Sequence, residues 1–135
     1  MRPILTALML SILLALPGLA QSRAEAIQGI IGNQFEAFKA DDFDMAFSYA
    51  SPVIKNIFQT PERFGEMVKR GYPMVWRPAE VRYTELRDIA GRTYQKVLIV
   101  DQNGALHLLE YEMVEVDGIW QINGVQFLQE PRMGA

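Results

Sequence analysis

Cationic and aromatic side chains cluster between residues 69 and 77 of this sequence. Lys69, Arg70 and Arg77 stand close to Tyr72 and Trp76. Positive charge and ring stacking together can hold an anionic or aromatic ligand at the rim of a pocket. The two cations at 69 and 70 also suit the last turn of a predicted helix, where positive charge favours the helix dipole whatever the function. Tyr72, Trp76 and Arg77 are therefore candidate ligand-binding residues.

A second candidate group lies on a predicted strand. His107 is the single histidine, and strand alternation places it on one face with Leu109, Tyr111 and Met113. Such a histidine can contact a ligand, or it can be hydrogen-bonded on a half-buried face without any further role. No serine stands in a Gly-x-Ser-x-Gly turn that would supply a nucleophile for it. We predict His107 and Tyr111 as ligand-binding residues and name no catalytic residue.

Tyrosine hydroxyls could support isomerase chemistry if a carboxylic base faced the same cavity. Tyr83, Tyr94 and Tyr111 could supply the hydroxyl, but Asp88 and Asp101 lie near the ends of predicted strands. No acid–base pair can be named from the sequence.

The acidic run at residues 41 to 44 predicts a helix start rather than a cation site. A calcium loop beginning at Asp42 would need an oxygen ligand, a glycine and a glutamate at three later positions. Those positions hold Ala46, Phe47 and Val53. The chain contains no cysteine, so a thiolate metal site and a thiol nucleophile are also excluded. We expect no metal and no cofactor.

The first twenty residues have the order of a secretory signal peptide. Arg2 is followed by an apolar run from Ile4 to Leu16 and then by Pro17-Gly18-Leu19-Ala20. Cleavage after Ala20 is expected, with cleavage after Ala24 as the alternative. The apolar run is shorter than the roughly 20 residues that span a bilayer, so we expect no membrane attachment after cleavage. The prediction is a periplasmic or secreted protein with one domain over residues 21–135.

Composition limits the partners of that domain. Removal of residues 1–20 leaves 12 basic and 16 acidic residues, a formal net charge of −4. This balance opposes nucleic-acid binding, which depends on neutralising phosphates with Lys and Arg. Disulfides are excluded despite the oxidising destination, so stability must come from the packing of one core.

Helix signals fill the first half of the domain. Ser22 and Glu25 have capping-box spacing, and an apolar stripe follows over about residues 23–40. Further helix starts stand at residues 41–44 and at Thr60-Pro61, and the helix from Thr60-Pro61 ends at Gly71. Between them, Ser51-Pro52 ends the helix that starts at 41–44 and permits a further turn over residues 53–58. The two prolines in the stretch 72–78 predict an extended connector. The stripe consists of Ile27, Ile30, Ile31, Phe35 and Phe38.

The second half reads as four strands, at residues 80–88, 93–101, 105–116 and 119–128. The turn signals 89–92, 102–104 and Asp117-Gly118 separate them. Short successive turns predict an antiparallel meander, and helices followed by strands predict an α+β domain. We expect N-terminal helices packed on a curved four-stranded antiparallel sheet, a cone-shaped roll.

Several short motifs together resemble a known family. The order of elements and the ending Gly118-x-Trp120-x-Ile122-x-Gly124-Val125 resemble the nuclear-transport-factor-two-like (NTF2-like, or cystatin-like) superfamily. The chain is more narrowly similar to a bacterial family called domain of unknown function 4864. This resemblance implies the fold and an unassigned function, and no catalytic residues. The narrower resemblance rests on Gln34, Ala37-Phe38, Asp41-Asp42, Ala46-Phe47, Ala50-Ser51-Pro52, Gly71-Tyr72-Pro73 and Trp120-Gln121-Ile122.

The predicted sheet is apolar on both faces, because Val97-Leu98-Ile99-Val100 has no polar alternation. Helices can cover only one face, so the other is a candidate partner surface unless the carboxy-terminal tail covers it. Homodimers through the sheet are common among proteins of this fold, and a homodimer is the leading expectation for that face.

Three hypotheses about function follow. The first is a non-enzymatic exported domain that binds a small apolar or amphipathic ligand inside the cone, and it predicts a hollow cone with few buried charges. The alternative is an interaction module that pairs with itself or with an envelope protein, which predicts a filled cone. The second alternative is an isomerase- or hydratase-type enzyme, with a carboxylate and a tyrosine or histidine converging in the cavity.

Overall fold

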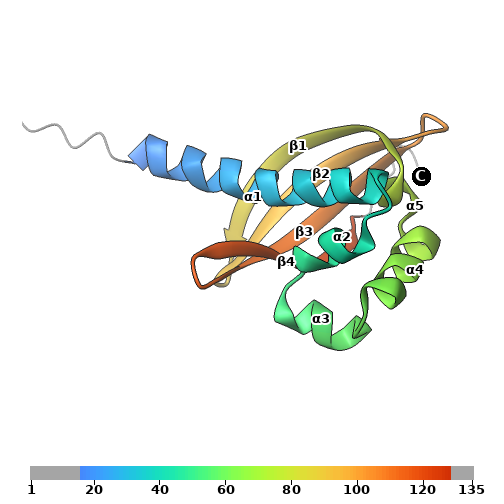
Figure 1. Ribbon diagram of the computed structural model, residues 1–135. Coiled ribbons are helices and arrows are strands. Elements are labelled where there is room, and N and C mark those ends of the chain that lie inside the picture. Colours follow the sequence, from blue (N-terminus) through green and yellow to red (C-terminus); the bar gives the residue numbers. More distant parts are fainter. Residues whose placement is uncertain (1–15, 129–135) are drawn as a thin grey trace, which may run out of the picture.

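A computed structural model describes residues 16–128 of the chain, and Figure 1 shows its arrangement. Helices come first and a four-stranded antiparallel sheet follows, which confirms the predicted α+β class and the NTF2-like roll. Most of the expected signal peptide lies outside the described residues. The elements are α1 (Leu16–Lys39), α2 (Phe43–Ser48), α3 (Pro52–Phe58), α4 (Pro61–Gly71), α5 (Pro73–Trp76), β1 (Pro78–Ile89), β2 (Arg92–Asp101), β3 (Leu106–Val116) and β4 (Ile119–Phe127).

The sheet is a meander in the order β1-β2-β3-β4, with each strand paired to the next. Its last turn is the predicted Asp117-Gly118 pair, in which both residues have positive φ, 51° and 79°. Two consecutive residues with positive φ form a type I′ hairpin turn, whose backbone twist matches the twist of the flanking strands. The local sequence therefore decides the register of the last hairpin.

Helix α1 lies along one face of the curved sheet, and α2, α3 and α4 gather near one end of it (Figure 1). The predicted apolar stripe of α1 meets that inner face: Ile27, Ile31 and Phe38 have no exposed surface. Opposite them, alternate residues of the central strands are equally buried, among them Val97 and Leu109. The core therefore lies between α1 and the inner face of the sheet. Within residues 16–128, no helix is long and apolar enough to cross a membrane.

Side-chain caps begin the three helices after α1, as predicted for the acidic run and for Thr60. Asp42 accepts from the backbone N–H of Met45 and Thr60 from that of Arg63. Ser51, which was expected only to end the preceding helix, also caps α3 by accepting from the N–H of Ile54. The expected cap at Ser22 is wrong, because α1 already begins at Leu16 and passes through this position. The surrounding alanine, glutamine and glutamate residues favour helix on both sides of the serine.

The predicted extended connector at residues 72–78 is also wrong, because residues 73–76 form the short helix α5. Pro73 stands in its first turn, where the missing N–H would have had no helical partner. Burial of Met74 and Val75 stabilises this turn against the core. A proline pair that forbids a long helix thus still permits one turn.

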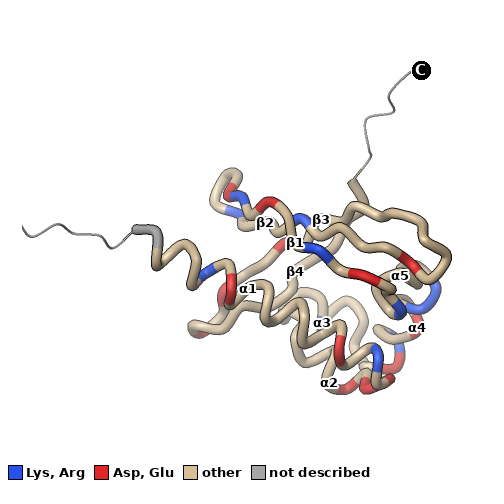
Figure 2. Tube along the Cα trace, turned by 90° about the horizontal axis from the view of Figure 1, so that it is seen from above, with Lys and Arg blue, Asp and Glu red and all other residues tan. Residues whose placement is uncertain are grey.

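The outer face of the sheet divides into two parts. One part carries ion pairs, of which Arg87–Glu110 is the most enclosed: the atoms lie 2.9 Å apart and the Glu110 side chain is 2% exposed. The other part, which we call the apolar corner, consists of the cross-strand pairs Leu98–Leu108 and Val100–Leu106. Basic and acidic residues alternate over the rest of the chain without a field of one sign (Figure 2).

Candidate binding pocket

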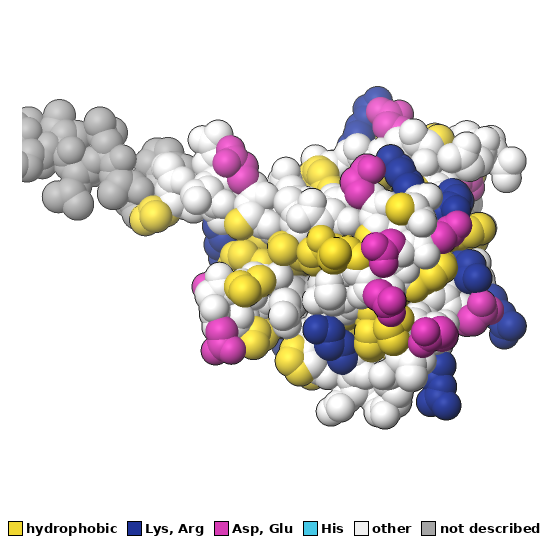
Figure 3. Space-filling model, in the orientation of Figure 1, with side chains coloured by type: hydrophobic (Ala, Val, Ile, Leu, Met, Phe, Trp, Pro, Cys, Tyr) yellow, Lys and Arg dark blue, Asp and Glu magenta, His cyan; other side chains and the backbone are white. Residues whose placement is uncertain are grey.

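A pocket of about 250 Å³ opens between α3, α4 and the edge of the sheet formed by β3 and β4. In the space-filling view, hydrophobic side chains reach the surface in the region of α3 and α4, with charged side chains around them (Figure 3). The lining residues are mostly apolar and come chiefly from α1, α3, α4, α5, β3 and β4. They are Gln34, Phe38, Ala50, Ile54, Ile57, Phe58, Phe64, Met67, Val68, Tyr72, Val75, Tyr111, Ile122, Gly124 and Val125.

Backbone hydrogen bonds attach the start of α3 to β4 and so fix one wall of the pocket. The Ser51 N–H donates to the Ile122 carbonyl at 2.8 Å, and the Ile122 N–H donates to the Tyr49 carbonyl at 2.9 Å. The Ser51 hydroxyl also donates to Oδ1 of Asn123 at 2.7 Å. The first turn of α3 is therefore held in place, while its remaining residues form the outer wall.

Tyr72 attaches the other wall, at the junction of α4 and α5. Its hydroxyl donates to the Val125 carbonyl at 3.1 Å. Its ring stacks on Phe127 with the ring centres 5.0 Å apart. Since both partners are on β4, Tyr72 spans the pocket from the helices to the sheet.

Gly65 lets α4 pack closely on α2. A Cβ atom at this position would lie 2.6 Å from a ring atom of Phe43, which is too close for any side chain without movement. The close contact places the apolar face of α4, with Phe64 and Val68, over the pocket. Glycine here thus serves the packing of the pocket wall rather than a turn.

Three polar side chains line the pocket, and no lining residue among those described carries a charge. Tyr72 is engaged with Val125, and Gln34 donates through Nε2 to the Ala46 carbonyl at 3.1 Å. Tyr111 is completely buried, yet its hydroxyl has no hydrogen-bond partner within the described chain. Burial raises the pKa of Tyr111 far above its ordinary value, with smaller contributions from Tyr83 and Tyr72. The hydroxyl therefore keeps its proton at neutral pH.

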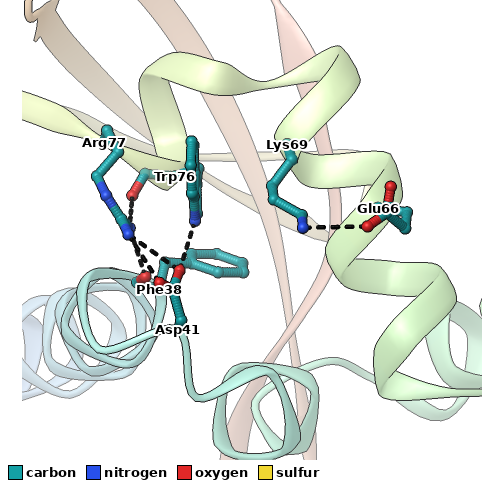
Figure 4. A network of polar contacts seen from close by, with 6 residues as sticks. All are labelled: Phe38, Asp41, Glu66, Lys69, Trp76 and Arg77. Atoms are coloured by element: carbon teal, nitrogen blue, oxygen red, sulfur yellow. Dashed lines mark hydrogen bonds and ion pairs between the residues drawn. The ribbon is translucent and has the colours of Figure 1, made fainter.

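The structure brings Tyr72 and Tyr111 to the pocket, but Trp76 and Arg77 lie in a separate network at the end of α1 (Figure 4). Asp41 accepts from Trp76 Nε1 at 2.9 Å and from Arg77 Nη2 through both carboxylate oxygens at 3.0 Å. Arg77 also donates to the Phe38 carbonyl at 2.7 Å and stacks over the Trp76 ring. Together these contacts give hydrogen-bond partners to polar groups at the exposed C-terminal end of α1.

The other cations of this stretch are also paired. Lys69 lies 3.0 Å and Arg70 3.7 Å from carboxylate oxygens of Glu66 on the same helix. The Lys69 ammonium also lies over the Phe43 ring, 5.4 Å from its centre (Figure 4 shows the Lys69–Glu66 pair). The close spacing of cations and rings in the sequence thus corresponds to intramolecular contacts.

His107 shares the inner face with Leu109 and Tyr111, as the strand alternation predicted, but it does not line the pocket. Its Nε2 lies 2.8 Å from Oδ2 of Asp101. The hydrogen bond from His107, with those from the backbone of Ala105 and Asn103, lowers the pKa of Asp101. No group of three or more His, Asp or Glu side chains in residues 16–128 is arranged to hold a metal ion.

Sequence reasoning did not assign the residues of α3 and α4 to the pocket. Ile54 and Met67 are half-buried and Ile57 is exposed, and the spacing of these apolar residues on short helices equals that of an ordinary core stripe. Gln34 could have been found, because a glutamine inside an apolar helical stripe is a buried polar group that needs a partner.

Comparison with known proteins assigns the chain to a family. A family model described as domain of unknown function DUF4864 matches residues 20–135. The chain belongs to this DUF4864 family. The narrower resemblance drawn from the sequence motifs is thereby confirmed. No curated protein matches this DUF4864 chain.

Two solved structures share the fold of this DUF4864 domain. One is the solution structure of a SEC-C motif-containing protein from Rhodopseudomonas palustris, with a TM-score of 0.57 and 15% identity over 84% of this chain and 88% of that chain. The other is a designed NTF2-like protein, with a TM-score of 0.53 and 16% identity over 78% of this chain and 98% of that chain. At these identities the likeness shows the NTF2-like fold alone.

Proposed function

We propose that this DUF4864 protein is an exported, non-enzymatic binding domain that holds a small apolar or amphipathic ligand in the pocket between α3, α4 and the β3–β4 edge. The observation that carries the proposal is an uncharged lining around a volume of about 250 Å³. Burial of apolar ligand surface against such walls is favourable by about 25 cal/mol per Å² and requires no desolvation of a protein charge. This hollow, uncharged interior is what the ligand-binding hypothesis requires.

The volume limits the size of the ligand. Small-molecule sites commonly measure about 300–1,000 Å³, and this pocket lies just below that range. Ile57, which lines the pocket and is 63% exposed, opens it to solvent. A compact molecule, or the first part of a short aliphatic chain, fits these dimensions.

The enzyme hypothesis finds less support in the pocket. An isomerase or hydratase needs a carboxylate or histidine beside the tyrosine to move a proton. The lining supplies Tyr111 and Tyr72 but no Asp, Glu or His from the described residues. Asp88 and Asp101 are engaged elsewhere, with Arg23 and His107. We therefore favour binding over catalysis at this site.

A pair of tryptophan substitutions on α3 tests the binding proposal. Ile54 lines the pocket, whereas the adjacent Val53 is 57% exposed and does not. We expect a neutral naphthylamine dye to bind the wild-type chain and Val53→Trp alike, with bright blue-shifted emission. Ile54→Trp should weaken binding at least tenfold, because the indole occupies the cavity. Absence of dye binding to the wild-type chain, or equal binding to both variants, would contradict the proposal.

A second candidate function concerns the apolar corner, for which we propose a second copy of this chain as the partner. The observation in its favour is that these residues lie on the sheet face opposite α1, with Leu106 60% exposed. We expect a dimer in sedimentation at micromolar concentration, and Leu106→Glu should shift it to monomer. Ile119→Glu, at an equally exposed position away from the corner, should not. A monomeric wild-type chain would refute this candidate.

A further inference from the structure

We infer that the ligand of this pocket is a single-chain amphiphile with an anionic head of the carboxylate class, whose tail fills the pocket while its head stays outside, beside Arg63 and Arg70. This inference rests on the proposed binding function and names the ligand class. It is carried by the uncharged interior of the pocket and by the positions of the charged residues along α4.

The head stays outside because the interior holds no group that would bind it. No Lys, Arg, His, Asp or Glu from residues 16–128 lines the pocket. Tyr72 and Gln34 already donate to backbone carbonyls, and the Tyr111 hydroxyl is enclosed by protein atoms. An ionised head moved inside would lose its hydration without gaining a counter-ion. Only the aliphatic part of an amphiphile therefore gains from entering.

Met67 connects the pocket with a second hollow on the surface of α4. Its side chain is half-buried and lines both of them. A tail that leaves the pocket past Met67 therefore brings its head to this hollow. The other residues that line the hollow are all charged, namely Glu62, Arg63, Glu66 and Arg70.

The helical period of α4 places the cations of this hollow nearer the pocket than the acids. Arg63 stands four residues before Met67 and Arg70 three residues after it, so both are its neighbours on the helix surface. Glu62 and Glu66 stand five residues and one residue before Met67, and these spacings place them on a different face. The hollow is therefore cationic on the side where it meets the pocket.

Arg63 has a charge that the fold itself does not use. It is exposed and makes no ion pair with a carboxylate of residues 16–128. Helix stability does not explain its position, because the helix dipole opposes a cation in the first turn. Arg70 is 84% exposed and lies 3.7 Å from Glu66, which has a closer partner in Lys69 at 3.0 Å. Both guanidinium groups can thus turn toward an anionic head.

Competition against the naphthylamine dye by three eight-carbon probes at neutral pH tests the inference. The probes are octanoate, octylammonium and 1-octanol, which differ only in the head. We expect octanoate to displace the dye at about fivefold lower concentration than octylammonium, with 1-octanol between them, because each exposed cation contributes a modest attraction. Raising the ionic strength from about 0.01 M to about 1 M shortens the screening length from about 30 Å to about 3 Å, so this preference should largely disappear.

Two arginine variants separate the charge from the cavity. The double variant Arg63→Gln with Arg70→Gln should bind the dye like the wild-type chain and respond to octanoate and octylammonium within about twofold of one another. Arg82→Gln removes an exposed arginine of β1, a strand that does not line the pocket, and should keep the full preference.

Three results would overturn the inference and leave the pocket proposal standing. They are equal displacement by octanoate and octylammonium in the wild-type chain, a preference for 1-octanol over both, and a preference for octanoate that survives the double variant. Failure of the dye to bind would overturn the pocket proposal itself.

Discussion

Two sets of polar groups differ in whether their hydrogen-bonding capacity is satisfied. One is the Asp41 network at the end of α1, and the other is the buried Tyr111 hydroxyl. Asp41, Trp76 and Arg77 satisfy one another and the Phe38 carbonyl. Tyr111 has no such partner within residues 16–128. Polar groups that satisfy one another stabilise a fold, whereas an enclosed donor without a partner lowers its stability. Clustered charge in the sequence therefore marks intramolecular contacts here, whereas the pocket has an uncharged lining.

Of the changes proposed here, loss of Arg77 should lower the free energy of unfolding most. Arg77→Met removes hydrogen bonds to three partners, Asp41 and the carbonyls of Phe38 and Trp76, and the stacking on the Trp76 ring, so we expect the free energy of unfolding to fall by about 2 kcal/mol. Urea denaturation measures this change. Arg82→Met, which breaks the exposed pair with Glu80, should change stability by less than about 1 kcal/mol. Dye binding should survive in both, and its loss in Arg77→Met would place Arg77 in the site after all.

The burial of the Tyr111 hydroxyl should make the stability of the protein depend on pH in the alkaline range. The folded-state pKa of Tyr111 is raised, first by burial, so the unfolded chain loses this proton near pH 10 while the folded chain keeps it. The protonated Tyr111 hydroxyl makes its full contribution to the free energy of unfolding below about pH 10. Above that pH, the contribution falls by about 1.4 kcal/mol per pH unit. Wild type should therefore lose stability above about pH 10 faster than Tyr111→Phe does. Parallel curves would show that the hydroxyl is not enclosed.

Removal of each pocket hydroxyl should change stability in opposite directions. Tyr111→Phe deletes an unpaired donor, so we expect the ligand-free protein to gain about 1 kcal/mol. Tyr72→Phe deletes the donor to the Val125 carbonyl and should lose about 1 kcal/mol. Thermal unfolding of the two variants side by side measures both. A loss in both variants would mean that the Tyr111 hydroxyl is satisfied in solution.

Acid should weaken the Asp41 network by a smaller amount. The hydrogen bond from Trp76, followed by that from Arg77, lowers the pKa of the Asp41 carboxyl. Its stabilising effect is therefore present above the unfolded pKa of about 3.9 and disappears as the pH falls toward the folded value. Asp41→Asn should make stability decline less steeply below about pH 4. Glu115→Gln, at an exposed position of β3, should not change that decline. An unchanged decline would argue against the network in solution.

The strands and their turns could be predicted because their signals are local. Asp117-Gly118 adopts the two positive φ angles that a short hairpin turn requires, and alternation then decides which residues face inward. The caps at Asp42, Ser51 and Thr60 are equally local. Helix α5 could not be predicted, because the burial of Met74 and Val75 stabilises it through distant contacts.

The site was predictable only in part. The strand pattern placed Tyr111 on the inner face, and Tyr72 was chosen for its position among cations that turned out to be paired elsewhere. Trp76, Arg77 and His107 do not reach the pocket, because Asp41 and Asp101 hold them at other places. The cavity itself depends on the separation of α4 from the sheet, a distance between remote segments that no local pattern encodes.

Methyl NMR of the full chain titrated with the neutral naphthylamine dye tests the central claim most directly, because it reports where a ligand binds. The account predicts shift changes at the methyl groups of Ile54, Ile122 and Val68, which line the pocket, and the loss of those at Ile122 and Val68 in Ile54→Trp. Changes confined to Leu98, Leu106 and Leu108 on the outer face, or no changes at all, would contradict it.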